Sequence, residues 1–265
     1  MQLTDTVHLV GSGQNGFSLT HPLDCHVYLL DGGTELAIID TGVGRDVPAI
    51  VGQIEAAGFR PSDITKILIT HLHLDHAGGA AELQQLCGAE IVASQDVAGW
   101  LETGDEEAAS LVAARQTGMY PVENRLRPVS SATGASGGDV IRVGSLAVTV
   151  VKADGHSQGH LAFLVDERAA SDDCAERADC TEYNDCVRRA LFCGDALFFG
   201  GRILLQNIWD CSLEESIATV RRFAKLEFTQ FFPGHVGFSL QDGKRHVDAA
   251  MAHINQLLPP PQLEA

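Results

Sequence analysis

The sequence lacks the features that mark membrane-bound and nucleic-acid-binding proteins. No stretch approaches the roughly 20 uninterrupted apolar residues that a membrane helix needs, and the first residues lack the basic flank and apolar run of a signal peptide. Only 18 Lys and Arg residues stand against 35 Asp and Glu residues, and the net charge of −17 repels polyanions. We therefore expect a cytoplasmic protein that binds neither nucleic acid nor membranes.

The cysteine pattern does not indicate a disulfide framework. The chain has seven cysteines, an odd number in a chain too large to need disulfide bonds for stability. Cys174, Cys180 and Cys186 lie six residues apart in an acidic stretch, a spacing that matches none of the usual zinc motifs. We interpret these three as free thiols in a surface loop, with a soft-metal or redox site as the alternative.

The overall composition predicts a folded chain with a large core. Of the 265 residues, 45% are hydrophobic and 20% are charged, and a chain of this length buries roughly 70–75% of its unfolded surface. We expect one domain over residues 1–265, made of two pseudo-repeated halves at about residues 1–140 and 141–265.

Strand and helix patterns alternate in both halves. Two apolar runs split by Gly32-Gly33 predict a hairpin over residues 26–40, and Asp46 with Pro48 predicts the start of a helix that ends near Gly58. Further strands are predicted at residues 66–70, 146–153, 161–165, 190–193 and 230–232, and further helices at 80–86, 212–225 and 244–258, with helices and loops over a cleft at 96–127. The order suggests two sheets packed face to face with helices outside.

Four polar side chains follow the strand at residues 66–70 within a span of six residues. They are His71, His73, Asp75 and His76. In an extended segment His71 and His73 point to the same side, and a turn at the next residues redirects Asp75 and His76 toward a neighbouring position. Imidazole and carboxylate ligands suit zinc, iron or manganese, and the lack of a thiolate argues against a structural zinc site. The cluster therefore predicts ligands for two metal ions.

Three further candidate ligands follow strands of the second half. His156, Asp195 and His235 are each preceded by glycine, a residue that allows the backbone to turn tightly beside a site. His160 lies four residues beyond His156, and we expect it to support the site rather than to bind metal. The remaining histidines lack this context and are assigned no role in the site: His8, His21, His26, His246 and His253.

The motif His71-Leu-His-Leu-Asp-His76, together with Asp40-Thr-Gly42 and the three later ligands, resembles the metallo-β-lactamase-fold hydrolase superfamily. The resemblance implies an α+β fold, a four-layer αββα sandwich. It also implies two divalent metal ions, most readily zinc, with iron or manganese as alternatives. One ion would be bound by His71, His73 and His156, the other by Asp75, His76 and His235, and Asp195 would bridge them. Asp40 would brace the loop without binding metal.

Within the superfamily, the segments 155–160 and 194–202 are similar to those of the glyoxalase II group. His73 disfavours the flavodiiron branch, and the bridging Asp195 disfavours a true β-lactamase. Ala153-Asp154 and Cys193 depart from the usual glyoxalase II pattern, and the 30 residues that follow His235 are too few for that group's glutathione-binding domain. We therefore expect the hydrolytic residues to match those of the glyoxalase II group better than the substrate does.

The implied reaction is hydrolysis of a small acyl substrate, an ester or a thioester, by a hydroxide held between the two metals. Asp75 is the candidate catalytic residue, as proton acceptor and shuttle, and the alternative is that it only binds metal. The rival functions are a lactonase with the same centre, a mononuclear iron dioxygenase acting on persulfides, and a nucleic-acid phosphodiesterase, which the charge disfavours. Aromatic residues such as Trp100, Tyr120 and Trp209 are candidates for an apolar substrate pocket or for the core.

Overall fold

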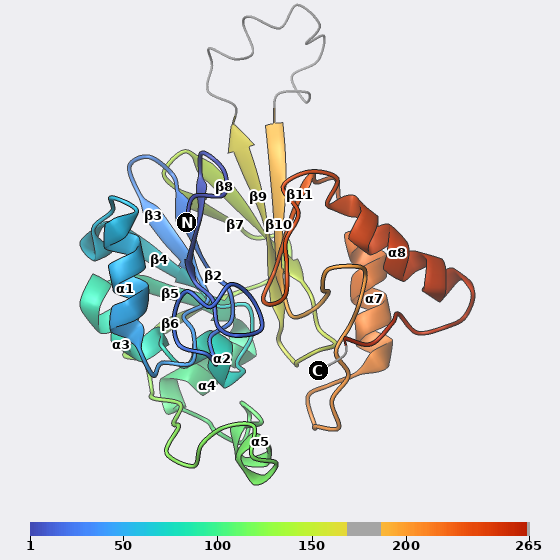
Figure 1. The fold of residues 1–265 in the computed structure, drawn as a ribbon, viewed down its shortest axis with the longest axis horizontal. Coiled ribbons are helices and arrows are strands. Elements are labelled where there is room, and N and C mark those ends of the chain that lie inside the picture. The colour runs from blue at the N-terminus through green and yellow to red at the C-terminus, as the bar shows by residue number, and fades with distance from the viewer. Residues whose placement is uncertain (169–186, 264–265) are drawn as a thin grey trace, which may run out of the picture.

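The computed structural model describes residues 1–168 and 187–263, and within these ranges the chain forms four layers (Figure 1). Two β-sheets lie face to face, and helices cover the outer face of each sheet. The predicted αββα sandwich is therefore confirmed. Cys174, Cys180 and Cys186 lie outside the described residues.

The first sheet has six strands in the order β1-β2-β3-β4-β5-β6. Strands β1, β2 and β3 pair antiparallel, and β3 to β6 pair parallel. The predicted hairpin forms β2 and β3, in which Tyr28 pairs with Ile39. The strands are β1 (Val7–Gly11), β2 (Val27–Asp31), β3 (Leu36–Ile39), β4 (Ile64–Leu68), β5 (Glu90–Ser94) and β6 (Ala132–Ala135).

The second sheet has five strands in the order β11-β10-β9-β8-β7. Its neighbours pair antiparallel except β10 and β11, which are parallel. The strands are β7 (Val140–Val143), β8 (Leu146–Lys152), β9 (Leu161–Arg168), β10 (Val187–Gly194) and β11 (Gln230–Pro233). Side chains such as Tyr28, Phe163, Phe192 and Phe232 fill the space between the two sheets, where burial of apolar area stabilises the sandwich.

Three of the helices in the described residues begin at a residue whose side chain caps them: Asp46, Ser94 and Ser212. Asp46 accepts a hydrogen bond from the backbone N–H of Ala49 at the start of α1, and Ser212 accepts one from Glu215 at the start of α7. The helices are α1 (Val47–Ala56), the 3₁₀ turn η1 (Pro61–Asp63), α2 (Leu74–Ala77), α3 (Ala80–Cys87), α4 (Gln95–Thr103), α5 (Leu111–Gln116), α7 (Leu213–Phe223) and α8 (Lys244–Asn255). None of the helices in residues 1–168 and 187–263 has the length and apolar character needed to cross a membrane.

Candidate metal centre

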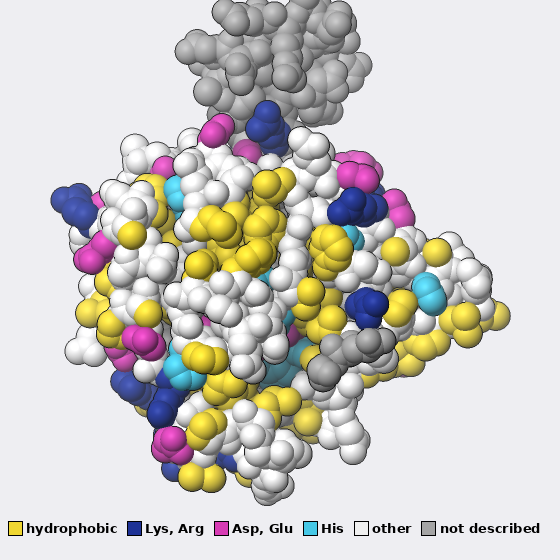
Figure 2. Space-filling model, viewed as in Figure 1, with side chains coloured by type: hydrophobic (Ala, Val, Ile, Leu, Met, Phe, Trp, Pro, Cys, Tyr) yellow, Lys and Arg dark blue, Asp and Glu magenta, His cyan; other side chains and the backbone are white. Residues whose placement is uncertain are grey.

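The seven predicted ligands come together at one edge of the sandwich. Four follow β4, with His73 at the N-terminal cap of the short helix α2, and His156, Asp195 and His235 follow β8, β10 and β11. Adjacent strand ends thus bring side chains from distant parts of the sequence into one place. Figure 2 shows histidine side chains at the floor of a depression between the two halves of the molecule, with hydrophobic side chains around it.

The first triad consists of His71, His73 and His156, whose ring nitrogens lie within 4.8 Å of one another. Nδ1 of His73 lies 3.0 Å from Nε2 of His156. His71 is fully buried, and its Nε2 atom has no hydrogen-bond partner among the described residues. A buried polar atom without a partner costs free energy, so this nitrogen requires a ligand that the chain itself does not supply.

The second triad consists of Asp75, His76 and His235. Oδ2 of Asp75 lies 3.1 Å from Nε2 of His235 and 3.7 Å from Nε2 of His76. The two histidine Nε2 atoms are 3.3 Å apart. Two imidazoles and one carboxylate therefore point at a common space.

Asp195 lies between the two triads. Its Oδ1 is 3.3 Å from Nε2 of His76, and its Oδ2 is 3.4 Å from Nε2 of His235 and 3.7 Å from Nε2 of His156. His156 belongs to the first triad and the other two histidines to the second. The carboxylate of Asp195 is thus the group that contacts both.

Asp40 orients one histidine of each triad through the ring nitrogen that points away from the triad. It contacts His76 directly and His71 through Thr70. It accepts a hydrogen bond from Nδ1 of His76 at 2.8 Å and one from the hydroxyl of Thr70 at 2.8 Å. That hydroxyl lies 3.0 Å from Nδ1 of His71 and, because it donates to Asp40, it accepts from His71. Each ring therefore turns Nε2 inward, which fixes the tautomer needed for binding metal. Asp40, expected to brace the loop, thus hydrogen-bonds His76 directly and reaches His71 through Thr70.

The other two histidines of the first triad are held in the same way. Nδ1 of His156 donates to the carbonyl oxygen of Leu204 at 3.3 Å, and Nε2 of His73 donates to Oδ2 of Asp210 at 3.2 Å. His73 therefore faces the triad with Nδ1, whereas His71 and His156 face it with Nε2. Acceptors outside the triads thus orient four of the five histidine rings, those of His71, His73, His76 and His156.

Burial sets the charge of these groups in the folded chain. It lowers the pKa of His71 well below the usual range and lowers the pKa of His156 to about 4, so both rings are neutral at pH 7 and their inner lone pairs are available. Burial opposes ionisation of Asp195, but the charges of His235 and His76 outweigh it and hold the pKa of Asp195 well below its usual range. The neutral rings of His71 and His156 and the ionised carboxylate of Asp195 are therefore groups that can bind a cation.

The spacing of the donors fits divalent metal ions. A tetrahedral ion with metal–nitrogen bonds of about 2.0–2.1 Å separates its nitrogen ligands by roughly 3.3 Å. The His73–His156 and His76–His235 nitrogen pairs lie 3.0 and 3.3 Å apart. Imidazole with carboxylate suits zinc, iron or manganese. The unpartnered Nε2 of His71 and Oδ1 of Asp195 are the atoms that such an ion would satisfy.

Four residues around the centre were not among the predicted ligands. His160 stacks on His71, with ring centroids 4.6 Å apart, and its Nε2 accepts the backbone N–H of Asp195 at 3.2 Å. Tyr120 donates its hydroxyl to Oδ1 of Asp75 at 2.8 Å. His26, to which the sequence assigned no role, lies with its ring 6.4 Å from that of His235. Asp210, described above, lies outside any local motif in the sequence.

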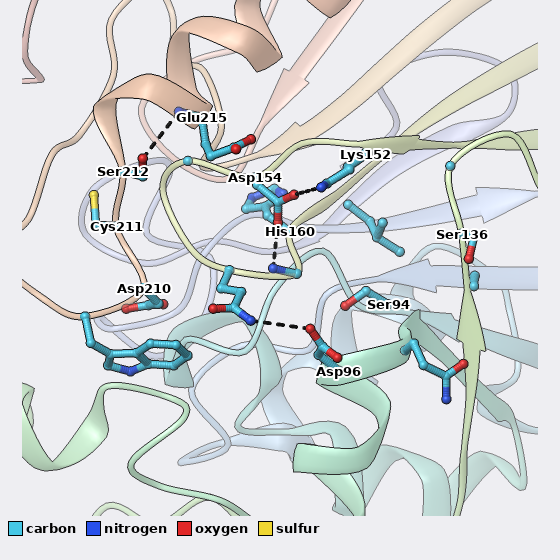
Figure 3. A pocket seen from close by; sticks show the side chains of 18 residues that line it. Ser94, Asp96, Ser136, Lys152, Asp154, His160, Asp210, Cys211, Ser212 and Glu215 are labelled. Atoms are coloured by element: carbon cyan, nitrogen blue, oxygen red, sulfur yellow. Dashed lines mark hydrogen bonds and ion pairs between the residues drawn. The ribbon is translucent and has the colours of Figure 1, made fainter.

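A pocket of about 560 Å³ adjoins the centre. Figure 3 shows Asp210, His160 and the ion pair of Lys152 with Asp154 on its walls. None of the seven predicted ligands lines it. The pocket contacts the centre only through residues that support the ligands, so it is separate from the space that the two triads share.

The metallo-beta-lactamase superfamily is the family whose sequence model matches this chain, over residues 21–168, more than half of the chain. The chain belongs to this superfamily.

Proteins named hydroxyacylglutathione hydrolase are similar in sequence. The one from Bradyrhizobium sp. (strain BTAi1) is 33% identical over 117 residues, which are 44% of this chain and 34% of that protein. The one from Synechococcus sp. (strain CC9605) is 27% identical over 205 residues, 77% of this chain and 62% of that protein. The matched part thus spans between a third and two thirds of these relatives.

Solved metallo-beta-lactamases share the fold of this superfamily member. A Cronobacter sakazakii enzyme with a HARLDQ motif superimposes with a TM-score of 0.69 at 20% identity, covering 97% of this chain and 96% of that one. A subclass B3 enzyme of Bradyrhizobium japonicum gives a TM-score of 0.65 at 22% identity, covering 100% of this chain and 85% of that one. At this identity the likeness establishes the fold.

Proposed function

We propose that this chain is a metal-dependent hydrolase that uses two divalent cations, most readily zinc, to cleave a small ester or thioester. The observation that carries the proposal is the position of Asp195, whose carboxylate contacts histidines of both triads at 3.3–3.7 Å. A carboxylate between two ligand sets is suited to bridge two ions. The similarity to hydroxyacylglutathione hydrolases supports an acyl substrate.

The residues divide into two ligand sets with one shared member. The first triad would hold one ion, the second triad the other, and Asp195 both. When bound, a pair of such ions lowers the pKa of a shared water to about 7 and polarises a substrate carbonyl. The chain itself supplies the neutral imidazoles, their orientation by Asp40 and Asp210, and the buried floor of the depression.

Asp75 is the residue that we assign to proton transfer. Burial opposes its ionisation, but the nearby His76 and the hydrogen bond from His235 outweigh this and hold the pKa of Asp75 below its usual range. Its carboxylate is therefore ionised at neutral pH. One oxygen faces the second triad and the other accepts the hydroxyl of Tyr120. A carboxylate in this position can take a proton from an attacking water and pass it to the leaving group.

The test combines metal content with a substrate panel. Elemental analysis of the purified chain should give two divalent ions per chain, and assays should show turnover of thioesters or esters above that of phosphodiesters. Asp195→Ala should lose most of the activity, and Asp248→Ala, on the exposed face of α8, should not. Turnover of lactones alone would assign the lactonase alternative. One iron per chain with oxygen consumption on persulfides would contradict the hydrolase.

A further inference from the structure

The segment 104–127, called here the insert, connects α4 to β6 and contains α5. Figure 1 shows α5 beyond α4 at the lower edge of the first half of the molecule, away from the helices that cover the sheet. The insert holds none of the seven candidate ligands. It nevertheless sends two side chains, those of Ser110 and Tyr120, to residues at the metal centre.

Ser110 acts on the first triad through Asp210. The carboxylate of Asp210 is 1% exposed and accepts three side-chain hydrogen bonds. They come from Oγ of Ser110 at 2.8 Å, Oγ of Ser157 at 2.7 Å and Nε2 of His73 at 3.2 Å. With the carboxylate fixed by two hydroxyls, the ring of His73 is held with Nδ1 turned toward His156.

Tyr120 acts on the second triad directly. Tyr120 is buried, with 9% of the residue's surface exposed. Its hydroxyl donates to Oδ1 of Asp75 at 2.8 Å. The other carboxylate oxygen, Oδ2, lies 3.1 Å from Nε2 of His235. The phenol thus occupies the outer oxygen and leaves the inner one to face the space shared by the triad.

Hydrogen bonds within the insert join segments on both sides of Ser110 and Tyr120. Arg115, on α5, donates to both carboxylate oxygens of Glu106 at 2.7 and 2.8 Å and also to the carbonyl oxygen of Asn124. The indole of Trp209, next to Asp210, donates to the carbonyl oxygen of Glu107 at 3.1 Å. The insert is therefore braced within itself and attached to the loop that carries Asp210.

We propose that the insert is a clamp that sets the retention of each metal ion separately, through Ser110 and Asp210 for the first triad and through Tyr120 for the second. This rests on the proposed function in that both triads bind metal. Hydrogen bonds that orient metal ligands change metal affinity by about 10–100-fold when they are removed. Ser110, Tyr120 and Asp210 are positioning residues, because each acts through another residue.

The experiment measures release of cobalt(II) from the loaded protein into excess chelator, followed by the visible absorption bands of the bound ion. His73→Ala and His235→Ala give the reference spectra for loss of each ion. Asp210→Asn should speed release of the first ion about 10–100-fold and leave the second unchanged, and Tyr120→Phe should do the reverse. Ser110→Ala should act in the same direction as Asp210→Asn, and the double variant should not exceed Asp210→Asn, because both lie on one path.

Two variants control for general loosening. Thr117→Val removes a hydroxyl of the insert that, among the described residues, hydrogen-bonds only the carbonyl oxygen of Ala114. Thr65→Val removes a hydroxyl near the start of β4, before the ligands, that bonds the carbonyl oxygen of Leu36. Both should release the two ions at wild-type rates. The clamp is overturned if Asp210→Asn and Tyr120→Phe behave like these controls, or if each speeds both ions equally. The wild-type stoichiometry separately tests the two-metal proposal, since one ion per wild-type chain would contradict it whatever the variants do.

Discussion

Gly234 leaves no room for a side chain beside Asp195. A Cβ atom on Gly234 would lie 2.2 Å from Oδ1 of Asp195 and 2.6 Å from Cε1 of His76. Both distances are shorter than atoms in van der Waals contact allow. The absence of a side chain at position 234 is therefore a condition for the carboxylate of Asp195 to lie between the two triads.

We expect Gly234→Ala to displace Asp195 and to weaken metal binding by about 10–100-fold, the range seen when ligand orientation is disturbed. Equilibrium dialysis against zinc, with activity measured on the same samples, checks this. Gly237→Ala is the matched control, because a Cβ there would meet Phe199 at an ordinary 3.7 Å. Wild-type zinc affinity in Gly234→Ala would show that the loop moves aside without cost.

The sequence indicated the seven candidate ligands because four of them come directly after a buried strand, and His156, Asp195 and His235 each follow a strand and a glycine. The physical role of the glycine nevertheless differs between positions. Gly155 has a φ of 138° and Gly194 a φ of 49°, values that side chains rarely allow, whereas Gly234 is required by close packing alone. The glycine pattern thus marks three side chains that the fold brings together, although one cause, the tight turn, does not explain all three glycines.

The sequence could not predict the residues that hydrogen-bond the ligands from distant positions in the chain. Asp210 lies 137 positions from His73, and Tyr120 lies 45 from Asp75. Neither pair has a fixed spacing that a motif could record, because the contact depends on how the insert and the 209–212 loop dock. Tyr120 was noted only as a candidate for a pocket or the core, and His26 was given no role at all.

The main strands and helices were predictable, but edges and ends were not. The hairpin of β2 and β3 and the cap at Ser212 follow local patterns. Strand β6 has the sequence Ala-Thr-Gly-Ala, without apolar alternation, and it is a strand because it pairs with β5. Helix α8 ends at Asn255 rather than at Leu258, because Leu257 has a φ of 61°, which is outside helical geometry.

The buried ring of His26 should make stability depend on pH. Burial, with the charge of His235, lowers the pKa of His26 to about 3 in the folded chain, against about 6.5 when unfolded. Below pH 6.5 the unfolded chain binds a proton that the folded chain does not, so the free energy of unfolding falls as the pH falls. One such group contributes a slope of about 1.4 kcal/mol per pH unit between those two pKa values.

Urea unfolding of the metal-free chain at pH 7, 6, 5 and 4 measures this slope. His26→Gln should lose stability less steeply than wild type, by about 1.4 kcal/mol per pH unit, since glutamine binds no proton in this range. His253→Gln, on the outer helix α8, provides the control and should keep the wild-type slope. Parallel curves for wild type and His26→Gln would show that His26 is protonated equally in both states.

The net charge of −17 should be visible in the substrate preference. Among the described residues, no Lys or Arg forms an ion pair with the seven candidate ligands. With two divalent ions bound, the net charge would be about −13, and this field should slow association of anionic thioesters, including those of glutathione, relative to neutral ones. The screening length falls from about 10 Å at 0.1 M salt to about 3 Å at 1 M.

We expect kcat/KM for an anionic thioester to rise several-fold between 0.1 and 1 M NaCl, and kcat/KM for a neutral thioester of similar size to stay constant. Steady-state assays on the same enzyme preparation measure both. A fall in kcat/KM for the anionic substrate as salt increases would contradict the prediction, because it would reveal a cationic group that attracts the substrate.

The role of Asp75 can be separated into binding metal and accepting a proton. Asp75→Asn keeps an oxygen that can face the second triad, and its amide can still pair with the hydroxyl of Tyr120, so excess metal should refill the site. A carboxamide cannot accept a proton at neutral pH, however, and loss of a general base typically costs about 10²–10⁴ in rate. We expect the turnover rate of Asp75→Asn to be reduced by that factor, with two ions per chain shown by elemental analysis of the assayed sample.

Tyr120→Phe, assayed at the same metal saturation, retains the carboxylate and should remain far faster than Asp75→Asn. If Asp75→Asn instead recovers near wild-type turnover at saturating metal, Asp75 only binds metal, and proton transfer falls to Asp195 or to solvent.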